Sequence, residues 1–321
     1  MHPGNYSTLK EFVLRGIPVP DYLVILFFSL LLFIFVLSLL GNLVIVIVVL
    51  LSSCLHSPMY FFLFNLSILE IGFTFSIIPV ILYNLLSRRK TISFYGCLIQ
   101  CYFYFFLGVA EFLLLAVMSF DRYVAICNPL HYHSIISVKV CIYLVLSCWL
   151  TGYFFMIWPV AALAKLPFCR SNIIDHFFCD IEPLLALACS KTHHIELLDF
   201  SIAIIVLLGS LTITTVSYIY IIITVLRIPS NSRRQKAFST CSAHIIAASI
   251  YYGSAMFMYL RPSNSPSLNL KKVVSILTAV ITPTLNPFIY TLRNKQVKEA
   301  LRRLIRGYLQ TTMQETVNFS E

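Results

Sequence analysis

The sequence predicts an all-α protein that crosses a membrane seven times. Of its 321 residues, 59% are hydrophobic and only 11% are charged, whereas charged residues make up about a quarter of an ordinary soluble domain. Hydrophobic runs long enough to cross roughly 30 Å of hydrocarbon recur between residues 22 and 292, with short connections between them. One membrane domain therefore fills most of the chain, although its length alone would suggest two soluble domains.

The seven runs are the predicted transmembrane helices. They cover residues 23–50, 59–86, 98–120, 140–163, 198–226, 238–260 and 272–292. An odd number of spans places the two termini on opposite sides of the membrane. Residues 1–22 form an amino-terminal segment without the pattern of a cleaved signal peptide. Asn5 begins a glycosylation acceptor sequence, which requires this segment to face the outside.

A short amphipathic helix is predicted after the last span. Over residues 294–310, apolar residues recur at helical spacing between lysines and arginines, which favours a helix on the inner membrane leaflet. The alternative is a disordered basic tail, which we expect for residues 311–321. The net charge of +10 fits membrane lipid or an acidic cytoplasmic partner and not nucleic acid, because the basic residues lie in short loops and in the tail.

The cysteines indicate which side of the membrane is oxidising. Basic residues divide almost evenly between the two sides and decide little. Cys97 begins the third span, and Cys169, Cys179 and Cys189 lie in the long loop of residues 164–197. Four cysteines on one side predict two disulfides, with three pairings open. This side is expected to be extracellular with the amino terminus, which leaves the carboxyl terminus in the cytoplasm.

Four polar side chains are predicted to share one depth inside the membrane. At a rise of about 1.5 Å per residue, Glu70 and Glu111 lie level with each other, and Asn42 and Asn286 lie close to that level. Two carboxylates in a low dielectric do not comfortably both stay charged. We expect Glu70 and Glu111 to form a site for a sodium ion or a proton that favours the resting state. The alternative is two neutral acids bonded to helix neighbours.

Four short motifs occur in order along the chain. They are Pro58-Met-Tyr-Phe-Phe62, Asp121-Arg122-Tyr123, Lys236-Ala-Phe-Ser-Thr-Cys241 and Pro283-Thr-Leu-Asn-Pro-Phe-Ile-Tyr290. The second follows an uncharged hydrophobic run, where a charge is rare unless it serves function. With these motifs the chain resembles the olfactory receptors within the rhodopsin-like G-protein-coupled receptors. The aromatic residue before the Asp-Arg pair is Phe120 in place of the family's usual tyrosine.

The resemblance implies a conformational switch. Pro287 removes a backbone hydrogen bond in mid-helix and Asn286 can replace it, so the helix can take two shapes; Tyr290 would move with this bend. Near Arg122, span six begins with basic residues and offers no acid. We therefore expect Arg122 to pair with Asp121 and with hydroxyls such as that of Thr240.

The resemblance also implies a ligand cavity in the outer half of the bundle. Its expected residues are Tyr104, Phe105, Gly108, Val109, Phe112, Ile202, Ala203, Val206, Tyr252, Met256, Tyr259 and Ala279. Without the resemblance, packing or lipid contact would explain them better. No formal charge is expected in the cavity, which favours a small, mostly apolar volatile ligand held by one or two tyrosine hydroxyls.

The implied function is that of an odorant receptor in the plasma membrane, which activates a stimulatory heterotrimeric G protein and raises cyclic AMP. The resemblance favours the disulfides Cys97–Cys179 and Cys169–Cys189, with Cys97–Cys189 as the main alternative. Because a bonded Cys179 offers no thiolate, no metal site is expected beside it. No cofactor is expected apart from the sodium ion. The motifs of hydrolytic enzymes are absent, and a transporter would show repeated halves that this sequence lacks.

Overall fold

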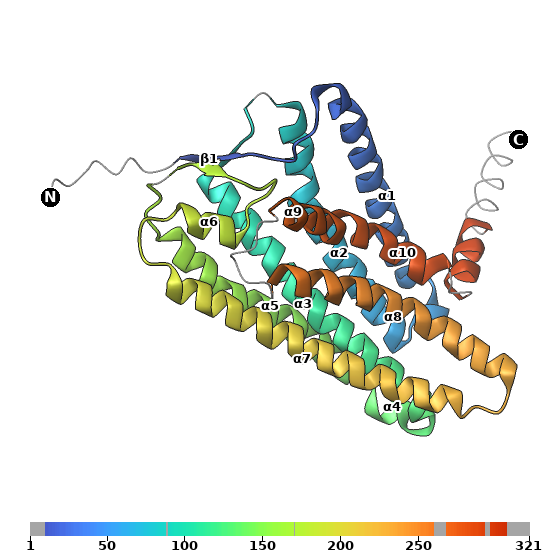
Figure 1. The fold of residues 1–321 in the computed structure, drawn as a ribbon. Helices are drawn as coiled ribbons and strands as arrows, with labels where there is room; N and C mark the ends of the chain where they lie inside the picture. The colour runs from blue at the N-terminus through green and yellow to red at the C-terminus, as the bar shows by residue number, and fades with distance from the viewer. Residues whose placement is uncertain (1–9, 88, 170, 260–267, 293–295, 307–321) are drawn as a thin grey trace, which may run out of the picture.

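The computed structural model describes residues 10–87, 89–169, 171–259, 268–292 and 296–306. The chain folds as a bundle of seven long helical segments, joined by short helices and three short strands (Figure 1). The long segments are α1 (Val24–Leu51), α2 (Pro58–Leu86), α3 (Phe94–Cys127), α5 (Val138–Ala164), α7 (His193–Leu226), α8 (Asn231–Tyr259), and a last one built from α9 (Leu268–Ile276), η4 (Leu277–Ile281) and α10 (Thr282–Leu292). The short helices are η1 (Asp21–Leu23), η2 (Ser53–Leu55), η3 (Pro129–His131), α4 (Tyr132–Ile135) and α6 (Ile181–Leu187).

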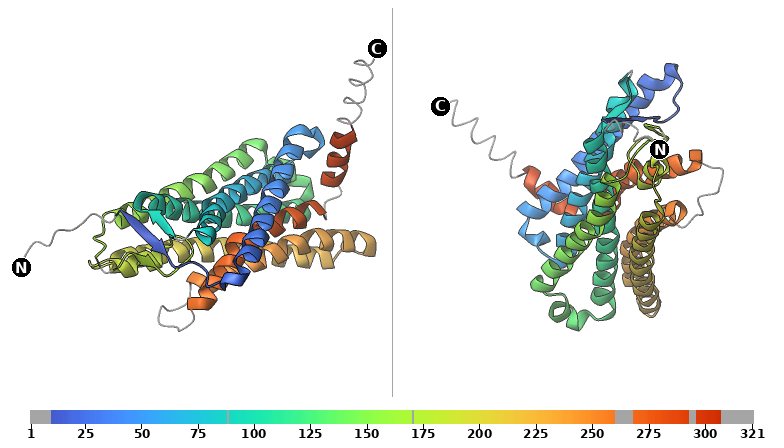
Figure 2. Two further views of the ribbon diagram at one scale, coloured as in Figure 1. Left: turned by 90° about the horizontal axis from the view of Figure 1, so that it is seen from above. Right: turned by 90° about the vertical axis from the view of Figure 1, so that its left-hand side faces the viewer.

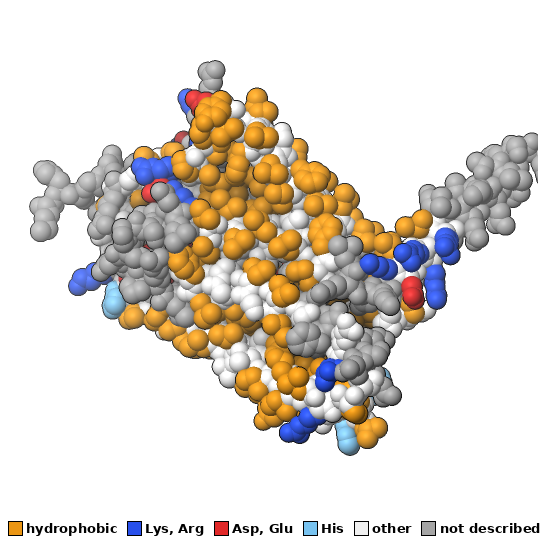
Figure 3. All heavy atoms as spheres, turned by 45° about the vertical axis from the view of Figure 1, so that its right-hand side comes forward, with side chains coloured by type: hydrophobic (Ala, Val, Ile, Leu, Met, Phe, Trp, Pro, Cys, Tyr) orange, Lys and Arg blue, Asp and Glu red, His pale blue; other side chains and the backbone are white. Residues whose placement is uncertain are grey.

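The outer surface of the bundle is apolar. Six helical segments of the described chain are long and apolar enough to cross a membrane. The remaining one, α8, has 29 residues but buries His244, Tyr251 and Tyr252 toward its neighbours. Figure 3 shows apolar side chains over the flank of the bundle, with lysines and arginines gathered toward its ends. Exposed side chains such as Phe154 and Ile205 would be costly in water, so this surface fits lipid.

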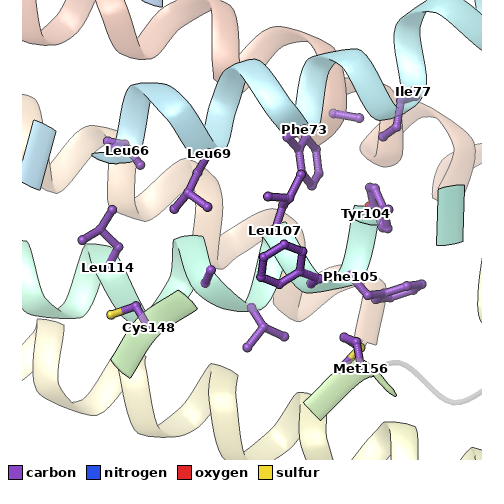
Figure 4. Close-up of a cluster of buried hydrophobic side chains, with 14 of the residues drawn as sticks. Leu66, Leu69, Phe73, Ile77, Tyr104, Phe105, Leu107, Leu114, Cys148 and Met156 are labelled. Carbon is purple, nitrogen blue, oxygen red and sulfur yellow. The ribbon is translucent and has the colours of Figure 1, made fainter. Parts of the chain in front are cut away.

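The central helix of the bundle is α3. In the most apolar stretch of α3, 67% of the residues are buried, against 11% in that of α1. Neighbours α2, α5 and α7 all pack against α3, and apolar side chains of α2 and α5 lie against it in Figure 4. The helix begins with the Ser93 hydroxyl accepting a hydrogen bond from the Gly96 amide at 3.1 Å. It continues to Cys127, so Asp121 and Arg122 lie within the helix.

A three-stranded sheet closes one end of the bundle, and the sequence analysis did not anticipate it. Strand β1 (Glu11–Leu14) lies between β2 (Thr91–Ser93), which is antiparallel to it, and β3 (Ile173–Ile174), which is parallel. Phe12 and Leu14 of β1 are fully buried. The two views of Figure 2 place this sheet at one end of the long helices. We call it the sheet end, and the opposite end, where α3 carries Asp121 and Arg122, the Arg122 end.

The last long segment is irregular in two places. The five residues of η4 form a π-helical turn, and such turns interrupt α-helices mostly at functional sites. Six residues after the end of η4, Pro287 lies within α10 and packs against Gly41 of α1. A Cβ atom added at Gly41 would lie 2.9 Å from the Cβ of Pro287. The bend in α10 is therefore tightly fitted against α1.

A further helix covers residues 296–306. Val297 and Ala300 are buried against the bundle, while Arg302, Arg303 and Arg306 are exposed. The Tyr60 hydroxyl donates a hydrogen bond to Gln296 Oε1 at 2.6 Å, which ties the start of this helix to α2. The helix is amphipathic, with its basic face directed away from the bundle.

Candidate functional site

A cavity of about 70 Å³ lies within the bundle, between α3 and α7. Side chains of α2, α5, α8 and η4 complete its wall. The lining residues are Phe73, Tyr104, Phe105, Gly108, Val109, Phe112, Met156, Asp199, Ile202, Ala203, Val206, Leu207, Tyr251, Ala255, Met258 and Thr278. Figure 4 shows Phe73, Tyr104, Phe105 and Met156 converging from three helices. The cavity belongs to the half of the bundle that lies toward the sheet end, because α3 begins beside β2.

The faces of α3 and α7 line this cavity as the sequence pattern predicts. The residues expected there that do line it are Tyr104, Phe105, Gly108, Val109, Phe112, Ile202, Ala203 and Val206. They recur at intervals of three and four residues, which is the spacing that keeps side chains on one helical face. The wall also includes Phe73 and Met156 from helices that the sequence analysis left out.

The predicted face of α8 was wrong by one residue. Tyr251, Ala255 and Met258 line the cavity, whereas Tyr252 and Met256 lie beside it. Tyr252 packs instead in a small apolar cluster, with its hydroxyl 3.2 Å from that of Thr214. A step of one residue turns the side chain by about 100°, and each of the two faces of α8 carries a tyrosine and a methionine, Tyr251 with Met258 and Tyr252 with Met256. The sequence pattern therefore did not distinguish them.

Ala279 and Tyr259 are the remaining residues that we expected on the cavity wall. Ala279 is fully buried in η4 but does not line the cavity, and its neighbour Thr278 does. The π-helical turn changes the direction of the side chains, which an α-helical spacing does not anticipate. The side chain of Tyr259 lies outside the described residues.

The expectation of an uncharged cavity was also wrong, because Asp199 contributes to its wall. Asp199 precedes Ile202, Ala203 and Val206 by three, four and seven residues. This spacing places all four on one face of α7. The spacing of Asp199 in the first turns of the fifth span therefore already indicated, in the sequence, that it lies on the same face as the expected cavity residues.

The loop between α5 and α7 covers the cavity and is held by two disulfides. Cys97 pairs with Cys179 and Cys169 with Cys189, with Cα atoms 5.4 and 5.9 Å apart, and this is the pairing that the family resemblance favours. Next to Cys179, the ring of Phe178 lies 4.6 Å from the ring of Tyr104 on the cavity wall. The loop therefore contacts the cavity directly.

Acidic side chains of the same loop have shifted pKa values in opposite directions. The pKa of Asp180 is raised to about 7 by burial and by the negative charges of Asp199 and Glu182. Asp175 instead accepts a hydrogen bond from Lys272 at 2.8 Å and pairs with Arg15 at 3.2 Å, and these cations lower its pKa. This ion cluster links the loop to α9 and to the segment after β1.

A buried polar network lies beneath the cavity. The Tyr251 hydroxyl donates a hydrogen bond to Glu111 Oε2 at 2.6 Å, and the Asn286 amide donates one to Glu70. Both glutamates are almost completely buried, and they lie close enough for the charge of Glu111 to act on Glu70. Asn42 donates to the carbonyl of Pro283 at 3.2 Å. Because Tyr251 also lines the cavity, one side chain joins the cavity to the network.

Several oxygen atoms of this network have no hydrogen-bond donor within the described part of the chain. They are Glu111 Oε1, Asn42 Oδ1 and Asn286 Oδ1. Buried polar atoms normally have a partner, and hard cations take oxygen ligands. These oxygen atoms fit the role of ligands for a sodium ion, of acceptors for an ordered water, or of a site for an added proton.

At the Arg122 end, Arg122 pairs with the adjacent Asp121, both side chains being largely buried. The other carboxylate oxygen of Asp121 accepts a hydrogen bond from the Tyr132 hydroxyl at 2.7 Å. Burial and this bond raise the pKa of Tyr132. The sequence analysis missed Tyr132, which follows α3 after a short turn. The side chains expected at Thr240 and Tyr290 lie outside the described residues.

Aromatic contacts connect α3 and α7 at this end. The ring of Tyr123 lies 5.7 Å from that of Tyr220, and the Cys127 thiol lies 3.2 Å from the Thr224 hydroxyl. His244 of α8 is buried close enough to Arg122 to be affected by its charge. These contacts bring three helices together around Arg122.

Comparison with known proteins agrees with this arrangement. The sequence model of the olfactory receptor family matches residues 31–307. Human olfactory receptor 6S1 is 52% identical over 94% of this chain and 92% of its own length. Human olfactory receptor 6C70 is 50% identical over 94% and 97%, and mouse olfactory receptor 6E1 is 50% identical over 93% and 96%. The chain therefore belongs to the olfactory receptor family of class A G-protein-coupled receptors, which are multi-pass proteins of the plasma membrane and not enzymes.

Proposed function

We propose that this chain is an odorant receptor that binds a small, mostly apolar volatile molecule in the cavity between α3 and α7. Binding activates a stimulatory heterotrimeric G protein at the Arg122 end and raises cyclic AMP. The observation that carries the proposal is the double role of Tyr251, which lines the cavity and hydrogen-bonds to Glu111. The family membership supports the class of ligand and of partner.

The proposed signal begins with displacement of the Tyr251 ring. This ring lies 4.6 Å from that of Phe112, also on the cavity wall, so a ligand between them moves Tyr251. Movement of Tyr251 weakens its hydrogen bond to Glu111. Glu111 shares the polar network with Glu70, and Glu70 is bonded to Asn286 beside Pro287. The bend in α10 is therefore within reach of the cavity through hydrogen bonds.

In the resting state, we assign a sodium ion or a proton to Glu70 and Glu111. The support is that Glu111 Oε1 and Asn286 Oδ1, which belong to this network, are buried and have no hydrogen-bond partner among the described residues. A cation there would hold α2, α3 and α10 together, and its release would accompany the movement of Tyr251. Receptors with Glu70→Gln or Glu111→Gln should lose the dependence of signalling on sodium and pH. An unchanged dependence in both variants would remove the ion from the proposal.

At the Arg122 end, activation requires Arg122 to leave Asp121 and to face the G protein. The hydroxyls of Thr240 and Tyr290 are proposed partners of Arg122 in the two states. The exposed side chain of Arg234, at the start of α8, is proposed to meet an acidic surface of the G protein. Arg122→Ala should abolish coupling and leave the amount of receptor at the cell surface unchanged.

The proposed orientation places the sheet end outside the cell. Strand β1 pairs with β2 and β3, so the amino-terminal segment lies on the side that holds both disulfides. Disulfides form and persist in oxidising compartments. Asn5, outside the described residues, would then be open to glycosylation. A glycosidase should shift the mobility of the receptor on a gel, and the shift should be absent in Asn5→Gln.

The decisive experiment compares two adjacent tyrosines in a cyclic AMP assay against a broad odorant panel. Tyr251→Phe removes the hydroxyl that reaches Glu111, whereas Tyr252→Phe removes a hydroxyl outside the cavity. Loss of one hydrogen bond to a charged group is worth about 1.5–3 kcal/mol, so Tyr251→Phe should change basal or ligand-induced signalling roughly tenfold or more. Equal behaviour of the two variants, at equal surface expression, would contradict the proposed path.

A further inference from the structure

Among the described residues that line the cavity, Asp199 is the only one with a formal charge. The other lining side chains are apolar, aromatic or neutral hydroxyl groups, so the wall carries one negative charge and no positive one. A carboxylate in such surroundings is costly unless a cation or a set of donors compensates it. An uncompensated carboxylate in a cavity therefore indicates the chemistry of what enters.

The carboxylate of Asp199 has no ion-pair or hydrogen-bond partner among the described residues. The ion pairs of the neighbouring loop involve Asp175 with Arg15 and Lys272. The electrostatic neighbour of Asp199 is another acid, Glu182, and Asp199 acts in turn on the half-buried Asp180. Burial raises the pKa of Asp180, and the negative charges of Asp199 and Glu182 raise it further. A cation beside Asp199 would offset the negative charge that these acids share.

The aromatic side chains of the wall favour an ammonium group over a neutral donor. Phe73 and Tyr104 face each other with ring centres 4.9 Å apart, and Tyr104 lies 5.0 Å from Phe105. All three line the same cavity as Asp199. The face of an aromatic ring attracts a cation by about 0.5–2 kcal/mol. The combination of a carboxylate with several rings suits an organic cation that has an apolar body.

We infer that the ligands of this cavity are small amines, bound as ammonium ions to the Asp199 carboxylate, with the hydrocarbon part against the aromatic wall. The inference rests on the proposed function only in taking this cavity as the ligand site. It replaces the expectation of an uncharged ligand. Low-molecular-weight amines are volatile as free bases, as the ligand of an odorant receptor must be. In water near pH 7 they are protonated, so they carry the positive charge that complements Asp199.

The cavity also limits the size of the amine. Its volume of about 70 Å³ is below the roughly 150 Å³ of a cavity that accommodates benzene. A ring of that size therefore needs side chains to move. Met156 and Met258 line the cavity, and methionine adapts its shape at low cost. Amines with a short hydrocarbon part are therefore expected to bind with the least rearrangement, and cyclic ones only if these side chains move.

The test measures binding by the purified full-length receptor in lipid nanodiscs, from the rise in its thermal midpoint with ligand. Isopentylamine and cyclohexylamine are compared with isopentanol and cyclohexanol, which have the same shape without the charge. The parent receptor should bind each amine at least about tenfold more tightly than its alcohol, and Asp199→Asn should lose that preference. Asp199→Glu, which keeps the charge, should retain it.

A matched control removes another acid from α7. Glu196 lies one turn before Asp199 but is exposed and bonded to Thr192, so Glu196→Gln should keep the preference for amines. An equal response of parent and Asp199→Asn to the amines would overturn the inference, as would the absence of any amine-induced shift in the parent. Because this readout needs no G protein, a receptor that binds amines but never raises cyclic AMP would contradict the proposed function alone.

Discussion

The two ends of the bundle are stabilised in different ways. At the sheet end, segments far apart in the chain are joined by two disulfides, a three-stranded sheet and the ion pairs of Asp175. At the Arg122 end, within the described residues, the ion pair joins the adjacent residues Asp121 and Arg122. Other polar contacts there are single bonds, such as that from Tyr132. The end nearer the cavity is cross-linked between distant segments, whereas the end proposed to transmit the signal is held by local, weaker contacts.

This difference suits a protein that must recognise at one end and move at the other. A preformed cavity costs less to occupy when its lid is already ordered. A switch, in contrast, needs two arrangements that differ by only a few kcal/mol. Local ion pairs and single hydrogen bonds have energies in that range, whereas a covalent bond does not.

Removal of a disulfide should have the largest effect on the difference between the two ends. Cys97→Ser opens a link between residues 82 positions apart, and Cys169→Ser one between residues 20 apart. Chain entropy predicts losses of about 4 and 3 kcal/mol in the free energy of unfolding. Surface expression and thermal midpoint should fall in both variants, and further in Cys97→Ser. A milder effect of Cys97→Ser would show that the lid is not the main restraint.

The next largest effect concerns packing in the half of the bundle toward the sheet end. A Cβ atom at Gly152 of α5 would lie 2.6 Å from the backbone oxygen of Phe106 on the central helix α3. Gly152→Ala must therefore push the two helices apart, at about 1–3 kcal/mol. The control is Gly209→Ala, because nothing lies within 4 Å of a Cβ at Gly209. The thermal midpoints of the two purified variants measure these effects. Equal midpoints would contradict the close contact between α5 and α3 at Gly152.

A smaller effect tests the Arg122 end. Tyr132→Phe removes the hydroxyl that bonds to Asp121, which weakens the restraint on Arg122 by about 1 kcal/mol. Basal cyclic AMP should rise by roughly fivefold, with little change in thermal midpoint. Tyr143→Phe serves as control, because Tyr143 is exposed near the same end. Unchanged basal signalling in Tyr132→Phe would mean that this bond does not hold the resting state.

The smallest effect concerns the ion cluster of Asp175. Its pKa is lowered in the folded protein by the hydrogen bond from Lys272 and by the charge of Arg15. The stabilisation is therefore present above the unfolded pKa of about 4 and is lost as the pH falls through the folded pKa. Since Asp175 is partly exposed, it amounts to at most about 1 kcal/mol. The thermal midpoint of Asp175→Asn should be slightly lower than that of the parent at pH 7. The difference should shrink as the pH falls below about 4 and vanish only below the lowered folded pKa. A constant difference would point to a cause other than charge.

How far the sequence predicts the site depends on the kind of pattern in each helix. On α3 and α7, the residues expected at the cavity recur at intervals of three and four residues, and the face that they form lines the cavity. On α8, tyrosines and methionines occupy two neighbouring faces, so spacing alone chose the wrong one. Asp199 lies on the face of α7 that lines the cavity, but it was not expected there because the cavity was predicted to be apolar. Tyr132 follows α3 across a turn, where no periodic pattern applies.

The sequence by itself determined that the chain is a membrane bundle of seven helices, because hydrophobic length and the scarcity of charge are properties of each segment alone. It also identified the Asp121-Arg122 pair and the buried polar layer, since charges inside hydrophobic runs stand out without coordinates. Only the tertiary structure decided the rotation of α8 and the pairing of β1 with β2 and β3. These depend on contacts between segments far apart in the chain, which no local pattern encodes.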